Sequence, residues 1–188
     1  MRQYEDAYQC FKFIGPTPID FDKVIRANKG GSTRCVWRDM CNFELSNQLA
    51  TGKYKIGIIF NTDPHDKSGE HWISMFINLT NNTIFFYDST GDPIPREIQM
   101  FIDRIVEQGK KLPTPITFSV DTSEGITTHQ TGGTECGVYS LFFIINTLIN
   151  NLTAAAIKSQ PLPDKYMKRF RKKLFNYDPN KRHRKLLK

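Results

Sequence analysis

The chain has 188 residues, 39% of them hydrophobic and 12% aromatic, which supports one compact domain with a core and argues against a second full domain. No apolar run approaches the roughly 18 residues of a membrane span, and the opening MRQYEDAYQC lacks the basic start and apolar core of a signal peptide, so we expect an intracellular protein without a membrane span. The net charge of +7 is gathered at one end, because residues 165–188 hold 11 of the 26 Lys and Arg against one acid, Asp178.

This basic segment follows a slightly acidic body, which is left with 15 of the 26 Lys and Arg and 18 of the 19 Asp and Glu. A basic appendage on such a body suits nucleic acid or another polyanion. A solvated helix face followed by a solvated tail is an equally good interpretation.

The first third of the chain has the weakest pattern. PIDFDKVIRANKGG, residues 18–31, predicts a short helix with Pro near its start and Gly past its end. From residue 54 the pattern sharpens into short β-branched and aromatic runs separated by Asn, Asp, Pro and Gly. These runs, YKIGIIF, HWISMFIN and TIFFYDS, predict adjacent strands of a central meander.

Helical periodicity dominates the rest of the chain. PIPREIQMFIDRIVEQG, residues 93–109, predicts an amphipathic helix, and ITFSV predicts a further strand at 116–120. The run that begins at Cys136 is apolar on every side and predicts a helix buried in the middle of the fold. LPDKYMKRFRKKLF predicts a last helix that docks on the body through one apolar stripe, which comprises Tyr166, Met167, Phe170 and Leu174.

Helices and strands are mixed without regular alternation, which predicts an α+β fold with a central mixed sheet flanked by helices. No repeat or linker divides the chain. We expect a single catalytic domain over residues 1–176, including an N-terminal helical region, and a basic C-terminal tail over 177–188.

The four cysteines are Cys10, Cys35, Cys41 and Cys136. They have neither the short paired spacing of a zinc site nor the density of a disulfide scaffold. Reduced thiols and no metal site are therefore predicted.

Cys136 stands at the junction HQTGGTECGVYS, where a Gly-rich turn meets the start of the central helix. Unpaired N–H groups and the positive end of the helix dipole stabilise a thiolate there. Gly137 would let a substrate backbone approach closely. The alternative is that Cys136 is a small buried hydrophobe, the commoner fate of a single cysteine.

A nucleophilic cysteine needs a base and a group that orients the base. His71 begins one predicted strand and Asp88 ends the next, so an antiparallel hairpin brings both to the same sheet edge. Taken singly, each could be an ordinary polar residue at a strand end or turn. Their combination with Cys136 favours catalysis.

These residues resemble the cysteine proteases of the adenovirus protease and SUMO-protease superfamily, whose chain order is His, Asp, Gln, Cys. The matching positions are His71-Trp72, Asp88, Gln130 and Cys136-Gly137. Within this superfamily the chain resembles more strongly the polyprotein-processing proteases of African swine fever virus and its large-DNA-virus relatives. The segments that carry this resemblance are NTDPHDKSGEHW, HQTGGTECGVYSLFFI and DKYMKRFRKKLF. The resemblance covers most of the chain but not the N-terminal arm domain of the African swine fever enzyme.

The resemblance implies that His71 is the general base and acid for Cys136, with Asp88 orienting its imidazole. It implies that the Gln130 amide joins the backbone N–H of Cys136 in an oxyanion hole. Trp72 belongs either to the core or to the wall of the cleft, where it and Gly137 would bind substrate. SUMO proteases carry a second, upstream tryptophan that helps to enclose the glycine tail of the substrate. Trp37 lies too near His71 in the sequence to match it, which disfavours a SUMO-specific function.

The predicted function is a viral cysteine endopeptidase that cleaves structural or core polyprotein precursors after Gly-Gly-type sites, without a cofactor, in the host cytoplasm and the virion. One alternative is removal of ubiquitin-like modifiers, and the superfamily also includes acetyltransferases. Another is a nucleic-acid-binding protein on an inactive protease scaffold. DNA or another polyanion is a candidate partner of the C-terminal tail.

Overall fold

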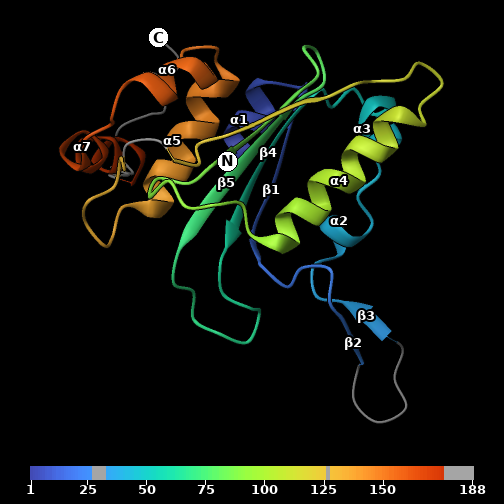
Figure 1. The fold of residues 1–188 in the computed structure, drawn as a ribbon, viewed down its shortest axis with the longest axis horizontal. Helices are drawn as coiled ribbons and strands as arrows, with labels where there is room; N and C mark the ends of the chain where they lie inside the picture. Colours follow the sequence, from blue (N-terminus) through green and yellow to red (C-terminus); the bar gives the residue numbers. More distant parts are fainter. Residues whose placement is uncertain (27–32, 126–127, 176–188) are drawn as a thin grey trace.

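The computed structural model of the chain describes residues 1–26, 33–125 and 128–175 (Figure 1). In chain order its elements are α1 (Arg2–Ala7), β1 (Phe11–Pro18), β2 (Val24–Arg26), β3 (Thr33–Cys35), α2 (Arg38–Cys41), α3 (Leu45–Ala50), β4 (Lys55–Asn61), β5 (Trp72–Asn78), β6 (Thr83–Tyr87), α4 (Arg96–Lys110), β7 (Ser119–Thr122), α5 (Cys136–Leu148), α6 (Ala154–Ser159) and α7 (Asp164–Phe175). Within the described ranges, no helix is both long and apolar enough to cross a bilayer.

The main sheet has five strands in the order β1-β4-β5-β6-β7. The β4/β5 and β5/β6 pairs are antiparallel, whereas β1 runs parallel to β4 and β7 runs parallel to β6. The predicted mixed sheet and its central meander are therefore confirmed. A separate pair, β2/β3, projects from one end of the molecule (Figure 1).

Helices cover both faces of this sheet, with α2, α3 and α4 on one side and α5, α6 and α7 on the other (Figure 1). Side chains alternate between the faces along each strand, as a pleated strand requires. On β6, Ile84 and Phe86 belong to the core beneath α4, and Phe85 and Tyr87 belong to the core beneath α5. The result is a three-layer α+β domain, as predicted.

The helix that begins at Cys136 is buried as predicted, with nine of its 13 residues buried. It packs closely on the sheet at Gly57 of β4. A Cβ at Gly57 would lie 2.7 Å from Cγ2 of Ile144, which is too close for any larger residue without a shift of the helix. Gly57 thereby helps to fix the depth at which α5 sits on the sheet.

The N-terminal region differs from the prediction. Residues 18–26 do not form the predicted helix: Pro18 ends β1, and Val24–Arg26 is a strand paired with β3. The rest of the predicted helix, residues 27–31, lies outside the described residues. β-branched Val24 and Ile25 favour a strand, and the prolines of β1 are tolerated because β1 is the edge strand of the sheet. The helices of this region are the short α1, α2 and α3.

Two later boundaries also differ. The strand predicted at 116–120 is found at Ser119–Thr122, because Phe118 is buried in the α4 core and the Ile116 N–H donates to the carbonyl of Gly109 instead of to the sheet. Helix α6 was not predicted. The tail over 177–188 lies outside the described residues, so its separation from the domain stays a prediction.

Candidate active site

His71 and Asp88 meet at the sheet edge that the sequence predicts. His71 immediately precedes β5 and Asp88 immediately follows β6, and these strands are antiparallel. Nε2 of His71 lies 2.8 Å from Oδ1 of Asp88, with the Asp88 side chain 4% exposed. A hydrogen bond this short and buried fixes the plane of the imidazole.

Asp88 is itself held in place by the turn that follows it. Its Oδ1 also accepts hydrogen bonds from the backbone N–H and the hydroxyl of Thr90, and its own N–H donates to Oγ of Ser123 at 2.8 Å. The carboxylate is therefore oriented before any substrate binds.

Cys136 is the first residue of α5, and its side chain is buried beside that of His71. A direct tether holds this end of the helix on the sheet, since the Ser140 hydroxyl donates to the carbonyl oxygen of Trp72 at 3.1 Å. Trp72 adjoins His71 in the chain, and Ser140 lies one turn beyond Cys136. The tether thus holds the start of α5 against the strand that follows His71.

The surroundings of this pair favour thiolate and imidazolium. Burial raises the pKa of Cys136, but hydrogen bonds from His71 and the backbone of Trp72, the charge of His71 and the Gly137 N–H outweigh it, and the net pKa is lowered. The pKa of His71 is raised to about 10, chiefly by its hydrogen bonds to Asp88 and Cys136, against the opposing effect of burial. These surroundings therefore favour a thiolate at Cys136 without any bound ligand.

Gln130 lies in the loop that leads to Cys136, and it is 7% exposed. The hydroxyl of Ser89 donates to Oε1 of Gln130 at 2.9 Å, which turns the amide nitrogen toward the loop, where Nε2 donates to the carbonyl of Gly132 at 2.5 Å. This bond uses one amide hydrogen and leaves the second. Neighbouring His129 has a structural contact, with Nδ1 2.9 Å from the buried hydroxyl of Tyr87.

Trp72 is half-buried and packs at the border of the α5 core. It therefore has features of both a core residue and a residue of the cleft wall. Its indole lies against the start of α5, because a Cβ on Gly137 would be 3.8 Å from the ring. Two surface hollows meet at Trp72. One includes Gly137 and Arg171, and the other includes Trp37.

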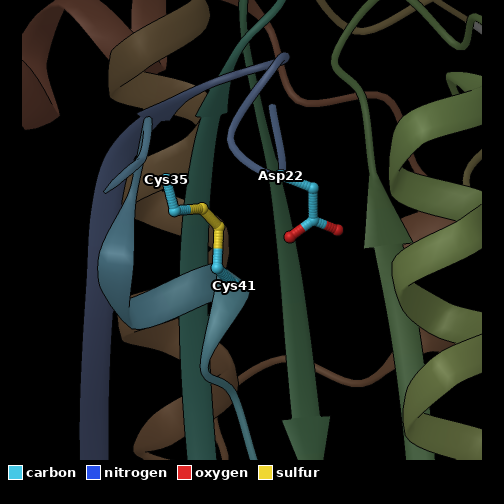
Figure 2. Close-up of side chains that lie close together, drawn as sticks. All are labelled: Asp22, Cys35 and Cys41. Atoms are coloured by element: carbon cyan, nitrogen blue, oxygen red, sulfur yellow. A yellow bond between two sulfur atoms is a disulfide. The ribbon is translucent and has the colours of Figure 1, made fainter. Parts of the chain in front are cut away.

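Two other cysteines lie together at a distance from Cys136. Figure 2 shows Cys35 of β3 joined to Cys41 of α2 in a disulfide, with the Asp22 side chain beside it. The two Cα atoms are 6.5 Å apart, within the usual range for a bridge. The prediction of reduced thiols is wrong for this pair, because α2 turns the chain back toward β3, and only Cys10 and Cys136 are free.

The disulfide bears on metal binding. Asp22, Cys35 and Cys41 form the single group of three metal-ligand side chains found among the residues that the structure describes. A disulfide has no thiolate to offer a metal, which leaves Asp22, an exposed carboxylate, as the remaining ligand. These residues do not fit a zinc site in this form.

Sequence reasoning missed several residues that support the site. They are Ser89, Thr90, Ser123, Ser140 and Asp164. Each is a short polar side chain whose partner comes from a distant segment or an adjacent turn, so no periodicity marks it. Only the position of Ser89 next to Asp88 offered any signal.

Comparison with known proteins agrees with the fold. Residues 44–184 match the Ulp1 protease family, C-terminal catalytic domain. A thiol protease of Acanthamoeba polyphaga mimivirus is 28% identical over 186 residues, covering 96% of this chain and 57% of the relative. A SUMO-1 cysteine protease of African swine fever virus is 30% identical over 122 residues, covering 63% of this chain and 43% of the relative.

The chain thus spans about half the length of these curated relatives. A crystal structure of an African swine fever virus protease has the same fold, with a TM-score of 0.70 and 22% identity over 90% of this chain and 61% of the other. At this identity the likeness supports the fold alone.

Proposed function

We propose that this chain, which belongs to the Ulp1 protease family, is a cysteine endopeptidase with Cys136 as nucleophile, His71 as general acid and base, and Asp88 as the group that orients His71. The observation that carries the proposal is the contact of one imidazole with two groups. Nε2 of His71 lies 2.8 Å from Oδ1 of Asp88, and the interaction of the same side chain with Cys136 helps to raise the pKa of His71. The other ring nitrogen, Nδ1, is therefore the one that exchanges a proton with the sulfur and the substrate.

The reaction follows from this arrangement. The Cys136 thiolate attacks the scissile carbonyl carbon, and the negative charge that develops on the carbonyl oxygen is met by the backbone N–H of Cys136 and the free amide hydrogen of Gln130. As the C–N bond breaks, His71 gives its proton to the leaving amine. Water then attacks the thioester while His71 takes its proton, and the thiolate leaves.

The proposed substrates are viral structural or core precursors cut after a Gly-Gly-type sequence, at sites of assembly in the host cytoplasm. A Cβ placed on Gly137 would lie 3.8 Å from the indole of Trp72, and a narrow approach to the sulfur between these two residues is part of the proposal. A substrate Cβ is rejected by steric clash in such a passage, and clash discriminates well against larger residues.

The test is digestion of candidate capsid or core precursors, followed by mass spectrometry of the new termini. We expect cleavage after glycine by the wild type and none by Cys136→Ala. Cys10→Ala is the matched control, because Cys10 is the other free cysteine, and it should retain full activity. Cleavage by Cys136→Ala would refute the mechanism, and equal cleavage after Leu or Arg would refute the specificity.

A second candidate, removal of a ubiquitin-like modifier, is favoured by Trp37. Trp37 lines the same hollow as Trp72, although the sequence alone disfavours its pairing with the cleft. Two indoles on one hollow can enclose an extended glycine tail. Faster release of a fluorophore from a modifier of the SUMO or ubiquitin type than from a Gly-Gly peptide, with a loss in Trp37→Ala for the modifier alone, would favour this function.

A further inference from the structure

The last helix, α7, is joined to the loop that carries Gln130 through one carboxylate. Oδ2 of Asp164, the first residue of α7, accepts hydrogen bonds from the Thr131 hydroxyl at 2.7 Å, the Gly132 N–H at 2.8 Å and the Thr131 N–H at 3.2 Å. Gly132 is the residue whose carbonyl accepts from the Gln130 amide. Asp164 is thus connected through Gly132 to Gln130, the proposed oxyanion donor.

The second oxygen of the same carboxylate contacts the catalytic helix. Oδ1 of Asp164 lies 2.9 Å from the hydroxyl of Tyr139, a fully buried residue one turn after Cys136 in α5. Burial and the nearby Asp164 raise the pKa of Tyr139 above its usual value, so this hydroxyl stays protonated. Its one hydrogen is shared among Oδ1 of Asp164 and the carbonyl oxygens of Leu162, at 2.6 Å, and His129, at 3.0 Å. Two oxygens of one side chain therefore connect the loop of Gln130 to the helix of Cys136.

A further contact from α7 holds the loop farther along. Nη2 of Arg171 donates to the carbonyl oxygen of Thr134 at 3.2 Å, two residues before Cys136. The segment between Gln130 and Cys136 is otherwise exposed over residues 131–134. Helix α7 thus holds both ends of an exposed loop whose internal bonds alone would leave it loosely fixed.

We propose that Asp164 is a positioning residue that fixes the amide of Gln130 relative to Cys136, so that the oxyanion hole is formed only when α7 is docked. The proposal rests on the proposed function. It assigns Asp164 no contact with the substrate. Asp164 affects the stabilisation of the negative charge on the carbonyl oxygen in the transition state. It does not affect the reactivity of the sulfur, because the contacts that lower the pKa of Cys136 come from His71, Trp72 and Gly137.

Two reactions of Cys136 separate these effects. Acylation by p-nitrophenyl acetate passes through a tetrahedral oxyanion: the thiolate adds to the ester carbonyl, and p-nitrophenolate leaves with the electron pair of the broken C–O bond. Alkylation by iodoacetamide displaces iodide at carbon and forms no oxyanion. The ratio of the two rates therefore reports the oxyanion hole, whatever peptide the enzyme prefers.

The variants are Asp164→Asn and Tyr139→Phe. Asparagine has one acceptor oxygen in place of two. Phenylalanine removes the hydroxyl of α5, and with it the contacts to Asp164 and to the carbonyl oxygens of His129 and Leu162, while Asp164 keeps its bonds to the loop. For Asp164→Asn we expect acylation to slow by about 10- to 100-fold, the range that follows from small misplacement of an oxyanion donor, with alkylation unchanged. Tyr139→Phe should show a smaller loss of the same kind.

Glu97→Gln is the matched control, because Glu97 is an exposed acid in the first turn of α4, on the opposite side of the sheet. Its two rates should equal those of the wild type. Equal slowing of acylation and alkylation in Asp164→Asn, or no slowing of either, would overturn the proposal. A wild type that acylates normally but cuts no Gly-Gly sequence would instead refute the proposed specificity and leave the role of Asp164 standing.

Discussion

The pairing of Cys136 with His71 determines the pH dependence at the residue scale. An ordinary cysteine thiol has a pKa of about 8.5. Because the pKa of Cys136 is lowered, its thiolate forms at a lower pH than that of an ordinary cysteine. The pKa of His71, about 10, means that its proton is lost only in alkaline solution. The ion pair therefore occupies the interval between the two values, and activity should fall on the acid side as the thiolate gains a proton and on the alkaline side as His71 loses one.

We expect the rate of Cys136 alkylation by iodoacetamide, measured across the pH range, to rise with a midpoint below the ordinary thiol pKa. Asp88→Asn removes the largest cause of the raised His71 pKa, so the alkaline limb of peptide hydrolysis should move to lower pH and the alkylation profile to higher pH. A wild-type profile centred on the ordinary thiol pKa would contradict the ion pair. Cys10→Ala serves as the control, with an unchanged profile.

At the scale of elements, the bridge between β3 and α2 gives a prediction about stability. It closes the short loop from Cys35 to Cys41, and the loop-entropy relation gives about 2 kcal/mol for a loop of that length. Reductant should lower the urea midpoint of the wild type by a corresponding amount. The double variant Cys35→Ser/Cys41→Ser should show the lower midpoint with or without reductant.

Counting thiols tests the bridge directly. Alkylation in denaturant without reductant should modify two cysteines, Cys10 and Cys136, as detected by mass spectrometry. Modification of all four cysteines in freshly purified protein would contradict the bridge. Both sulfurs lie 3.1–3.2 Å from the carbonyl oxygen of Phe21, so free thiols could donate to it and the reduced protein should remain folded.

The elements that could be predicted from sequence are those whose pattern is local. The strands around Ile58, Met75 and Phe85 and the helices beginning near Arg96 and Cys136 carry their own periodicity. Each ends at, or within three residues of, an Asn, Asp or Pro. β1 could not be predicted, because its two prolines oppose a strand and its stability comes from parallel pairing with β4, a strand distant in sequence.

The site follows the same division. The meeting of His71 and Asp88 could be predicted from strand ends, since an antiparallel hairpin fixes which ends adjoin. The supporting contacts of Ser140 and Asp164 could not, because each depends on how a helix packs against a segment far away in sequence. The bond between Cys35 and Cys41 depends on the direction of a four-residue helix, which has no sequence signature of its own.

At the scale of the whole molecule, the basic side chains of α7 lie on its solvent-exposed face, and apolar side chains of its other face pack on the domain. The six Lys and Arg of α7 are all exposed, whereas Met167 is buried and Phe170 and Leu174 are partly buried. The described half of the basic segment is thus a solvated helix face docked through its apolar side. This agrees with the predicted stripe, except that Tyr166 is 50% exposed and touches Phe142 with its ring edge.

The tail remains a sequence-based prediction, and truncation tests it. Deleting residues 181–188 removes five Lys and Arg without touching α7. We expect weaker binding to duplex DNA and a shallower dependence of affinity on salt, because fewer counterions are released. The melting temperature should be unchanged. An unchanged salt slope would show that the tail is solvated and does not bind DNA.

The position of α7 in the chain has a consequence for synthesis. Domains fold as their segments leave the ribosome, with N-terminal parts emerging first, and here His71, Asp88, Gln130 and Cys136 all precede Asp164. A nascent chain that has exposed all four would still lack the helix that, in our proposal, completes the oxyanion hole. Newly made enzyme should therefore be proteolytically silent until its last helix docks, which spares neighbouring nascent polypeptides from premature cleavage.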